Sequence, residues 1–379
     1  MTTARSRGHA GRATAMAAGA AALLLGASAS AEVPRSGALQ GSDWISAAAD
    51  IAVEGFGRPA GPWELDLPAD HGVHPEARTE LWQLSAHLSD AEGRPVGVQF
   101  LLFRIGLAEP EAPPPGSAWE ARALYRGHVV LVGAGDAGVV AEERFGRGMP
   151  GLAGFDPDLA ELRLDNWSLD LPAGEEPGPW TLAASAGDAR ISLTLDPGKA
   201  PLAVDGEATP FRGYAFSRLR AEGGIATPAG PVQVSGAAWF EHLWGDLPIP
   251  GGTPVASDRL QVQLDDGSEL SVVRTRRRDG TGVPTVDAVL IDAQGGAVTF
   301  AEAAARMEPA RLWQGDTAAW PVDWRLRLGD LQLAVTPVAD AQEHAFMVRT
   351  WSGLVEVEGR RGDRPVSGLG TLQLTGYGD

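Results

Sequence analysis

Residues 259–300, RLQVQLDDGSELSVVRTRRRDGTGVPTVDAVLIDAQGGAVTF, decide the fold class. Apolar and polar residues alternate along short runs, which is the period of a half-buried β-strand. Turn dipeptides separate the runs at Asp266-Gly267, Asp279-Gly280 and Gly295-Gly296, and such dipeptides are typical of hairpins. The stretch is therefore predicted to be an antiparallel meander.

The same pattern continues outward in both directions. Residues 84–104, 323–338 and 354–376 each read as two strands joined by a glycine-containing turn. Glycine and proline are abundant (49 and 28), and one short stretch, residues 300–308, has a helix-like pattern. Many short strands with few helices predict an all-β sandwich or barrel.

A weak internal repeat predicts two related β-domains in tandem. Trp167-Ser168-Leu169 precedes a run ending in LTLDP, and Trp324-Arg325-Leu326 precedes one ending in LAVTP. Upstream hairpins end at Arg104 and Arg276. Chance similarity among hairpins is the alternative. The predicted domains are residues 32–207 and 208–379, with a boundary near 205–213 or, as a second candidate, in the loop 246–254.

Residues 1–31 read as a secretory signal. Arg5, Arg7 and Arg12 precede a short apolar run, and the small residues 29–31 fit a cleavage site before Glu32. A disordered alanine-rich leader is the alternative. We therefore expect a secreted or periplasmic protein, and no other segment is apolar and long enough to give it a stable membrane anchor.

Charge and cysteine content exclude several classes of protein. The formal charge is -18, and removal of the three leader arginines gives -18 - 3 = -21, which repels nucleic acid. The chain has no cysteine. Disulfides, thiolate metal sites, cysteine nucleophiles and a lipidated N-terminal cysteine are thereby excluded.

Residues 237–246, AAWFEHLWGD, place a glutamate and a histidine between two tryptophans. The strand period of two puts Glu241 beside Trp239 on one face and His242 beside Trp244 on the other. Without a β-bulge, the two polar groups cannot form one acid–base pair. We expect one of them to line an interior and the other to contact the neighbouring domain.

A second polar group occupies residues 69–82. His71 and His74 lie in a predicted loop, and Glu80 heads an apolar strand face that continues with Trp82. A carboxylate there needs a partner or a raised pKa. Arg104 is a candidate partner because it follows apolar residues on its own strand face. A buried structural ion pair between Glu80 and Arg104 is the alternative to a catalytic role.

His71, His74 and Glu80 could also form a zinc site with an open position. Their spacing is loose and loop histidines are common, so no metal is predicted. No glycine-rich phosphate loop follows a strand and opens a helix, and the G-x-S-x-G pattern of serine hydrolases is absent. We therefore expect no cofactor.

Three signatures in order resemble one family. Residues 70–104, DHGVHPEARTELWQLSAHLSDAEGRPVGVQFLLFR, resemble the N-terminal signature of the carotenoid 1,2-hydratase (hydroxyneurosporene synthase) and AttH-like family. GYAFSRLRAEGGI (213–225) with VSGAAWFEHLWGD (234–246) resembles the central signature, and residues 319–378 resemble the C-terminal one. Two departures stand out: the family usually has Asp at the position of Glu241, and an acid at the position of Ser352.

The resemblance implies two tandem lipocalin-like antiparallel β-barrels behind a secretory signal. Many members are described as predicted secreted hydrolases, and some are encoded beside ABC-transporter subunits. The carotenoid branch adds water across a terminal C=C bond without a redox cofactor. A lipophilic small molecule is the expected ligand.

Hydration of an unactivated alkene needs a protonated carboxylic acid in apolar surroundings, and then water captures the carbocation. Glu241 and Glu80 are the candidate acids, and His71, His74 or His242 could position the water or act as base. Tryptophan faces would stabilise the cation, although plain barrel packing is their alternative role. The predicted substrate-binding residues are Trp82, Trp239, Trp244, Gln99, Arg104 and Tyr214.

Two functions therefore remain open. The first is a hydro-lyase or secreted hydrolase that acts on a lipophilic substrate by acid-catalysed addition of water or hydrolysis. The second is a non-catalytic binder or carrier associated with an ABC-type export system. A buried carboxylate with a raised pKa favours the enzyme, whereas pairing of both Glu80 and Glu241 with arginines favours the binder.

Overall fold

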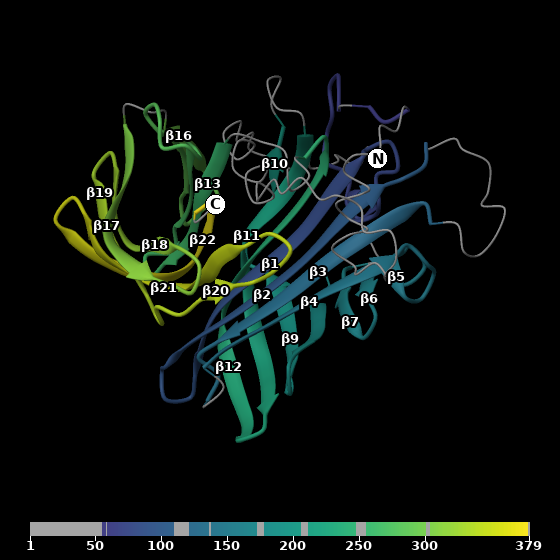
Figure 1. Cartoon of the computed structure of the whole chain (residues 1–379), viewed down its shortest axis with the longest axis horizontal. Coiled ribbons are helices and arrows are strands. Elements are labelled where there is room, and N and C mark those ends of the chain that lie inside the picture. Colours follow the sequence, from purple (N-terminus) through teal and green to yellow (C-terminus); the bar gives the residue numbers. More distant parts are fainter. Residues whose placement is uncertain are drawn as a thin grey trace, which may run out of the picture.

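The computed structural model describes residues 55–57, 59–109, 121–135, 138–172, 178–205, 211–247, 255–300 and 304–377. Their regular structure is almost entirely β-strand, arranged in two antiparallel sheets (Figure 1). The predicted all-β class is confirmed. The predicted signal segment 1–31 lies outside the described residues.

The first sheet has 12 strands in the order β4-β3-β2-β1-β12-β11-β9-β8-β7-β6-β5, with β10 paired to β11. Its strands are β1 (Thr79–Asp90), β2 (Pro95–Gly106), β3 (Ala123–Val132), β4 (Val139–Arg147), β5 (Ala153–Asp156), β6 (Glu161–Leu164), β7 (Trp167–Asp170), β8 (Trp180–Ala186), β9 (Ala189–Pro197), β10 (Leu202–Val204), β11 (Phe211–Thr227) and β12 (Gly230–Gly245).

The second sheet has 10 strands in the order β16-β15-β14-β13-β22-β21-β19-β18-β17, with β20 paired to β21. Its strands are β13 (Val255–Leu264), β14 (Glu269–Arg277), β15 (Thr285–Ile291), β16 (Ala297–Phe300), β17 (Ala305–Gln314), β18 (Ala319–Leu328), β19 (Leu331–Pro337), β20 (Glu343–His344), β21 (Thr350–Arg361) and β22 (Arg364–Thr375). The predicted hairpin turns are present, and Gly267, Gly280 and Gly295 adopt positive φ there.

The two sheets repeat one strand order. In each sheet the first strand pairs with the last (β1 with β12, β13 with β22), and three further strands extend outward from the first. Each sheet curls around its own apolar core as a lipocalin-like barrel (Figure 1). In this alignment β18 corresponds to β8, and the hairpin registers match Trp324 with Leu182, so Trp324 and Trp167 do not correspond.

The chain passes from the first sheet to the second between Gly245 and Val255. The predicted boundary at residues 207/208 thus falls before β11, inside the first sheet. The reason is pairing, because β11 bonds to β9 and β12 bonds to β1 along its length. The change of sheet coincides with the second candidate loop, 246–254, of which residues 248–254 lie outside the description.

The helix-like stretch 300–308 is not a helix where the structure describes it. Phe300 ends β16, and β17 begins at Ala305. Side chains alternate between buried (Ala305, Met307) and exposed (Arg306, Glu308), so the period of two prevails over the helical propensity of alanine and glutamate.

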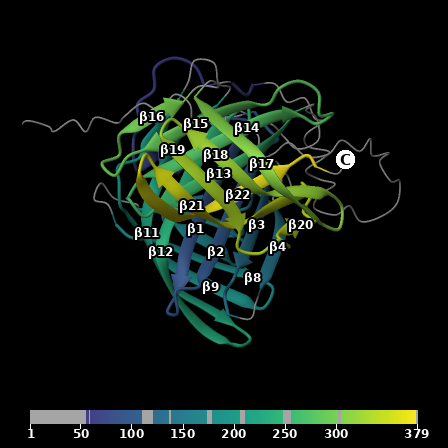
Figure 2. The ribbon, with the colours of Figure 1, turned by 90° about the vertical axis from the view of Figure 1, so that its left-hand side faces the viewer.

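The barrels pack against each other through β1, β2 and β3 of the first and β21 and β22 of the second. In Figure 2 the second sheet lies in front of the first. The contact is partly apolar, around Leu81, Phe103 and Val289. It is also polar: His87 bonds to Gln263 and Thr371. Among the described residues, no helix has the length and hydropathy needed to cross a bilayer.

Candidate functional site

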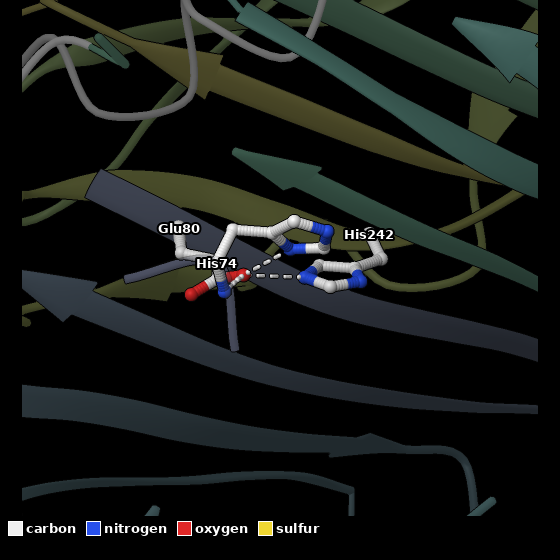
Figure 3. Close-up of side chains that lie close together, drawn as sticks. All are labelled: His74, Glu80 and His242. Atoms are coloured by element: carbon white, nitrogen blue, oxygen red, sulfur yellow. Dashed lines mark hydrogen bonds and ion pairs between the residues drawn. The ribbon is translucent and has the colours of Figure 1, made fainter. Parts of the chain in front are cut away.

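Three side chains meet inside the first barrel around one carboxylate oxygen (Figure 3). Oε1 of Glu80 lies 2.9 Å from Nδ1 of His74 and 3.0 Å from Nε2 of His242. Glu80 and His242 are fully buried, while the side chain of His74 is 14% exposed. We call these three residues the histidine–glutamate cluster.

Strand register and a short turn assemble the cluster. Trp82 of β1 faces His242 of β12, which places Glu80, two residues earlier, beside the imidazole on the interior face. The 3-10 turn η2 (Ala69–His71) precedes β1, and the loop between η2 and β1 carries His74. The backbone N–H of His74 also donates to Glu80 Oε1, at 2.9 Å, and so fixes the loop to the strand.

Asp70 holds the outer nitrogens of both imidazoles. Nδ1 of His242 donates to the backbone oxygen of Asp70 at 2.9 Å, and Nε2 of His74 lies 3.3 Å from Asp70 Oδ1. These contacts fix both rings with one nitrogen turned toward Glu80. His242 therefore carries its hydrogen on Nδ1, since a carbonyl oxygen can only accept.

The ionisation states follow from burial and these contacts. Burial alone would raise the pKa of Glu80, but the contacts with His242, when its Nε2 carries a proton, and with His74 outweigh burial and bring the pKa to about 2. Burial opposes protonation of His74, yet hydrogen bonds to Asp70 and Glu80 raise its pKa to about 9. Burial lowers the pKa of His242 below its ordinary value. Near neutral pH the cluster holds an anionic Glu80, a cationic His74 and a neutral His242.

In this state the cluster has room for one more proton, between His242 and Glu80. The His74 proton lies toward Glu80 Oε1, whereas His242 Nε2 presents a lone pair to the same oxygen at 3.0 Å. Two acceptors at hydrogen-bond distance attract a proton. This position between His242 and Glu80 is where the site can accept a proton from a bound molecule.

Indole rings fix the imidazoles in place. Trp244 stacks on His74 with centroids 3.6 Å apart and an interplanar angle of 2°, and Trp82 stacks on His242 at 4.5 Å and 19°. Trp63 meets Trp244 edge-on at 5.4 Å. The stacked rings cover one face of each imidazole and favour a cationic imidazole over their faces.

Arg104 separates the cluster from a cavity of about 460 Å³. Its Nη1 donates to the backbone oxygen of Ala77 at 3.1 Å and lies 3.5 Å from Glu80 Oε2, so the predicted pairing of Glu80 with Arg104 is present. The cavity has a mixed lining that includes Val73, Tyr125, Met149 and Phe155. Its volume is typical of small-molecule pockets.

His71 does not face Glu80. Its Nδ1 bonds to the hydroxyl of Tyr214, and its ring meets Trp180 edge-on at 5.6 Å. Burial, with repulsion from His242, lowers the pKa of His71 to about 3. Burial also raises the pKa of Tyr214 well above its ordinary value, so both groups are neutral. His71 and the Tyr214 hydroxyl therefore share a hydrogen bond between neutral groups beside the cluster.

Glu241 lies on the opposite side of β12, as the strand period predicted. The register of β12 against β1 is unbroken from Gly245 to Val234, so no bulge brings Glu241 and His242 together. Glu241 accepts hydrogen bonds from Trp239 Nε1 and Gln261 Nε2, both at 2.9 Å, and pairs with Arg259. These donors belong to the contact between the barrels and hold an ionised carboxylate there.

Gln99 and Trp239 also belong to the contact between the barrels. Gln99 accepts a hydrogen bond from Ser352 at 2.6 Å. The residues predicted from the sequence for one site therefore lie at two separate sites in the fold. Glu80, His74, His242, Trp82, Trp244, Arg104, Tyr214 and His71 surround the first-barrel site, whereas Glu241, Trp239 and Gln99 lie between the barrels.

Asp70 was not singled out from the sequence. Its signal was a carboxylate four residues before His74 in a loop already rich in histidine. Tyr125 was missed as well, and burial raises its pKa to about 12, beside Arg104. Its position on β3 carried no motif that distinguishes it from a core aromatic.

The cluster could also hold a metal ion. The ligand atoms of His74, Glu80 and His242 all lie within 4.8 Å of one another. Two imidazoles and a carboxylate suit zinc. The triad differs from the one weighed in the sequence, because His242 takes the place of His71. The expectation of no metal stays a prediction.

Comparison with known proteins gives consistent results. The sequence model of the AttH-like family matches residues 58–377. A crystal structure of a candidate AttH from Nitrosomonas europaea is 26% identical, with a TM-score of 0.71 over 85% of this chain and 99% of that one. Kievitone hydratase from Nectria haematococca shares the fold at 14% identity, with a TM-score of 0.61 over 86% of this chain and 96% of that one. No functionally curated protein matches the chain.

Proposed function

The chain belongs to the AttH-like family, and from this premise we propose that it is a hydratase-type enzyme that adds water to a lipophilic substrate at the histidine–glutamate cluster. The observation that carries the proposal is the buried Glu80 oxygen between two imidazole nitrogens, with one proton missing. Buried groups with displaced pKa values inside a barrel are typical of reaction centres. The similarity in fold to a hydratase supports the same reaction class.

The cluster favours activation of water over protonation of an alkene. Glu80, with a pKa of about 2, is no proton donor near neutral pH, and Glu241 is held by Arg259 between the barrels. Neither carboxyl group is then the protonated acid that an unactivated alkene requires. The site instead suits a substrate whose C=C bond or ester is already polarised by a carbonyl group.

His242 is the base in this mechanism. Water gives one proton to Nε2 of His242 while its oxygen bonds to the electrophilic carbon, and Glu80 stabilises the resulting imidazolium. His242 then returns the proton to the neighbouring carbon. In addition to a C=C bond, one O–H bond of water and the π bond of the substrate are broken, one C–O and one C–H bond are formed, and the cluster recovers its starting state.

The experiment uses water labelled with oxygen-18 and mass spectrometry. The chain is incubated with an acyclic carotenoid, an α,β-unsaturated ketone with an alkyl tail and a long-chain p-nitrophenyl ester. We expect labelled oxygen in the product from the ketone or the ester. Glu80→Gln and His242→Gln should lose this product, and Glu241→Gln, altered at the neighbouring residue on the other side of β12, should keep it. Equal product from all four proteins would reject the cluster as the reaction centre.

A carrier is the second candidate, and one observation favours it. Both Glu80 and Glu241 face arginines, Arg104 and Arg259, which is the pairing expected of structural carboxylates. A carrier that serves an export system would retain the unlabelled ketone or carotenoid through gel filtration without converting it. Retention without product identifies a carrier, and product formation excludes a purely carrying role.

A further inference from the structure

The histidine–glutamate cluster brings three potential ligand atoms together inside the first barrel, all within 4.8 Å of one another. We propose that His74, Glu80 and His242 bind one divalent transition-metal ion, with zinc as the best match. The three ligand atoms belong to a mixed nitrogen and oxygen set, and they come from β1, β12 and the loop between η2 and β1. Three protein ligands leave the fourth position of a tetrahedral zinc open.

The distances agree with this ion. Zinc bonds nitrogen and carboxylate oxygen at about 2.0–2.2 Å, so tetrahedral ligand atoms lie roughly 3.3 Å apart. Glu80 Oε1 lies 2.9 Å from His74 Nδ1 and 3.0 Å from His242 Nε2. Each imidazole nitrogen needs to move away from Glu80 Oε1 by only a few tenths of an ångström, and all three ligand atoms lie within 4.8 Å of one another. His74 can supply this movement because it sits on a loop and keeps some exposure.

In each imidazole, the nitrogen that points away from Glu80 makes the kind of contact that is typical of a histidine bound to a metal. A histidine that binds a metal through one nitrogen usually donates its other N–H to a carboxylate or to a backbone carbonyl. His74 faces the Asp70 carboxylate through Nε2, and His242 donates to the Asp70 carbonyl through Nδ1. One residue thus orients both rings with their inner nitrogens turned toward Glu80, as Figure 3 shows for the inner side of the cluster. Binding of a metal ion would release the proton that His74 Nδ1 carries.

Glu80 supplies a further indication. Its second oxygen, Oε2, accepts no hydrogen bond among the described residues, and its neighbour Arg104 Nη1 lies at 3.5 Å. A fully buried carboxylate oxygen without a hydrogen bond is costly unless another positive charge is close. A divalent ion between the imidazoles provides that charge and still leaves Arg104 in place.

The inference concerns the same cluster as the proposed function, but it does not require that the protein be an enzyme. If both hold, the ion polarises the water that the cluster activates. Because binding can be measured without any substrate, a failure of one proposal is distinguishable from a failure of the other.

The test starts from the full chain, purified without a polyhistidine tag, stripped with a chelator and dialysed. Cobalt(II) is titrated while its visible absorption is recorded, and zinc is then added in competition. We expect about one equivalent of tightly bound ion with the intense bands of a four-coordinate site, displaced by zinc. The zinc content of the protein before stripping is measured by mass spectrometry.

Variants decide where the ion binds. His74→Gln and His242→Gln should weaken binding by more than ~100-fold, and Asp70→Asn by ~10- to 100-fold. His87→Gln and His128→Gln, altered at buried histidines outside the first-barrel site, should bind as the parent does. His74→Gln is the variant that matters most if His242→Gln fails to fold, because His74 is partly exposed.

The absence of saturable cobalt binding by the parent would overturn the inference. Equal binding by the parent, His74→Gln and His242→Gln would also overturn it, because the ion would then sit elsewhere. Addition of water by a chain that binds no ion would leave the proposed function standing and remove only the metal. Ion binding without addition of water would support the metal site and reject the proposed function.

Discussion

The two barrels share one strand order but place different chemistry around corresponding buried carboxylates. Glu80 on β1 and Asp258 on β13 both lie inside their barrel and are fully buried. Glu80 faces two imidazoles, with Arg104 at 3.5 Å. Asp258 faces Arg274, Arg276 and the hydroxyl of Tyr377. The same topology thus supports two kinds of charge pair.

The difference indicates that the Glu80 site, and not the Asp258 site, can transfer a proton. Guanidinium groups do not lose their protons in proteins, so the Asp258 group has permanent partners. Imidazoles gain and lose a proton near neutral pH, and in the first barrel one is cationic while the other is neutral. Burial raises the pKa of Asp258, whereas the imidazole contacts lower that of Glu80. The first barrel therefore contains the charge pair that can exchange a proton, and the proposed reaction requires such a pair.

The largest expected effect separates the two carboxylates by activity. Glu80→Gln should reduce addition of water by ~100- to 10,000-fold, because the charge that stabilises the His242 imidazolium is removed. Asp258→Asn should leave the rate per folded molecule within about threefold of the parent. Product is measured by mass spectrometry, with the folded fraction taken from circular dichroism. A larger loss in Asp258→Asn would reverse the assignment of the two barrels.

Stability should show the opposite order. Asp258→Ala leaves the half-buried Arg274 and Arg276 without their carboxylate, which should cost roughly 3–5 kcal/mol of unfolding free energy. Glu80→Ala should cost less, on the order of 1–3 kcal/mol, because His74 can release its proton once the carboxylate is gone. Urea unfolding of both variants against the parent measures the difference. A larger loss of unfolding free energy in Glu80→Ala would contradict this account, because loss of a carboxylate beside imidazoles would then cost more than loss of one beside guanidinium groups.

A smaller effect concerns the contact between the barrels. His87 is buried there against Gln263 and Thr371. Burial, with repulsion from Arg218, lowers its pKa to about 4. The unfolded chain protonates His87 near pH 6.5, so between about pH 6.5 and 4 the unfolded state binds more protons. Stability should therefore fall as the pH decreases through this window, by up to ~3 kcal/mol from His87.

The control for this effect is His87→Gln, which keeps a hydrogen-bonding side chain but cannot titrate. Urea unfolding at pH 7, 5.5 and 4 should show a shallower loss of stability in the variant than in the parent. Other buried histidines, His128 and His344, also have lowered pKa values and contribute equally to both curves. Parallel curves would show that His87 is already protonated in the folded chain.

The fold was predictable because its signals are local. Turn dipeptides such as Asp266-Gly267 and the period of two define hairpins without knowledge of the rest of the chain, and the same period placed Glu241 and His242 on opposite faces. The change of sheet was not local. It depends on the pairing of β12 with β1, across about 150 residues of sequence, which no turn signal reveals.

The sequence predicted most of the residues of the site, but it did not predict which of them contact one another. Glu80, His74 and His242 were all singled out, yet the pairing of His242 with Glu80 across β1 and β12 follows from register. His71 and His74 lie three residues apart in one loop, but only His74 reaches Glu80, since η2 turns His71 toward Tyr214. Asp70 was missed because half of its role comes from a backbone carbonyl, which any residue provides.

The central claim is that the cluster can accept one more proton between His242 and Glu80. Its most direct test is to determine which ring nitrogens of His74 and His242 carry a proton, by nitrogen-15 NMR of chelator-treated protein. The account predicts that at pH 7 His74 is cationic and loses its proton near pH 9, while His242 is neutral with its hydrogen on Nδ1. Assignment uses His74→Gln and His242→Gln. Two neutral rings or two cationic rings at pH 7 would contradict the account, because the position between His242 and Glu80 would then not be one proton short.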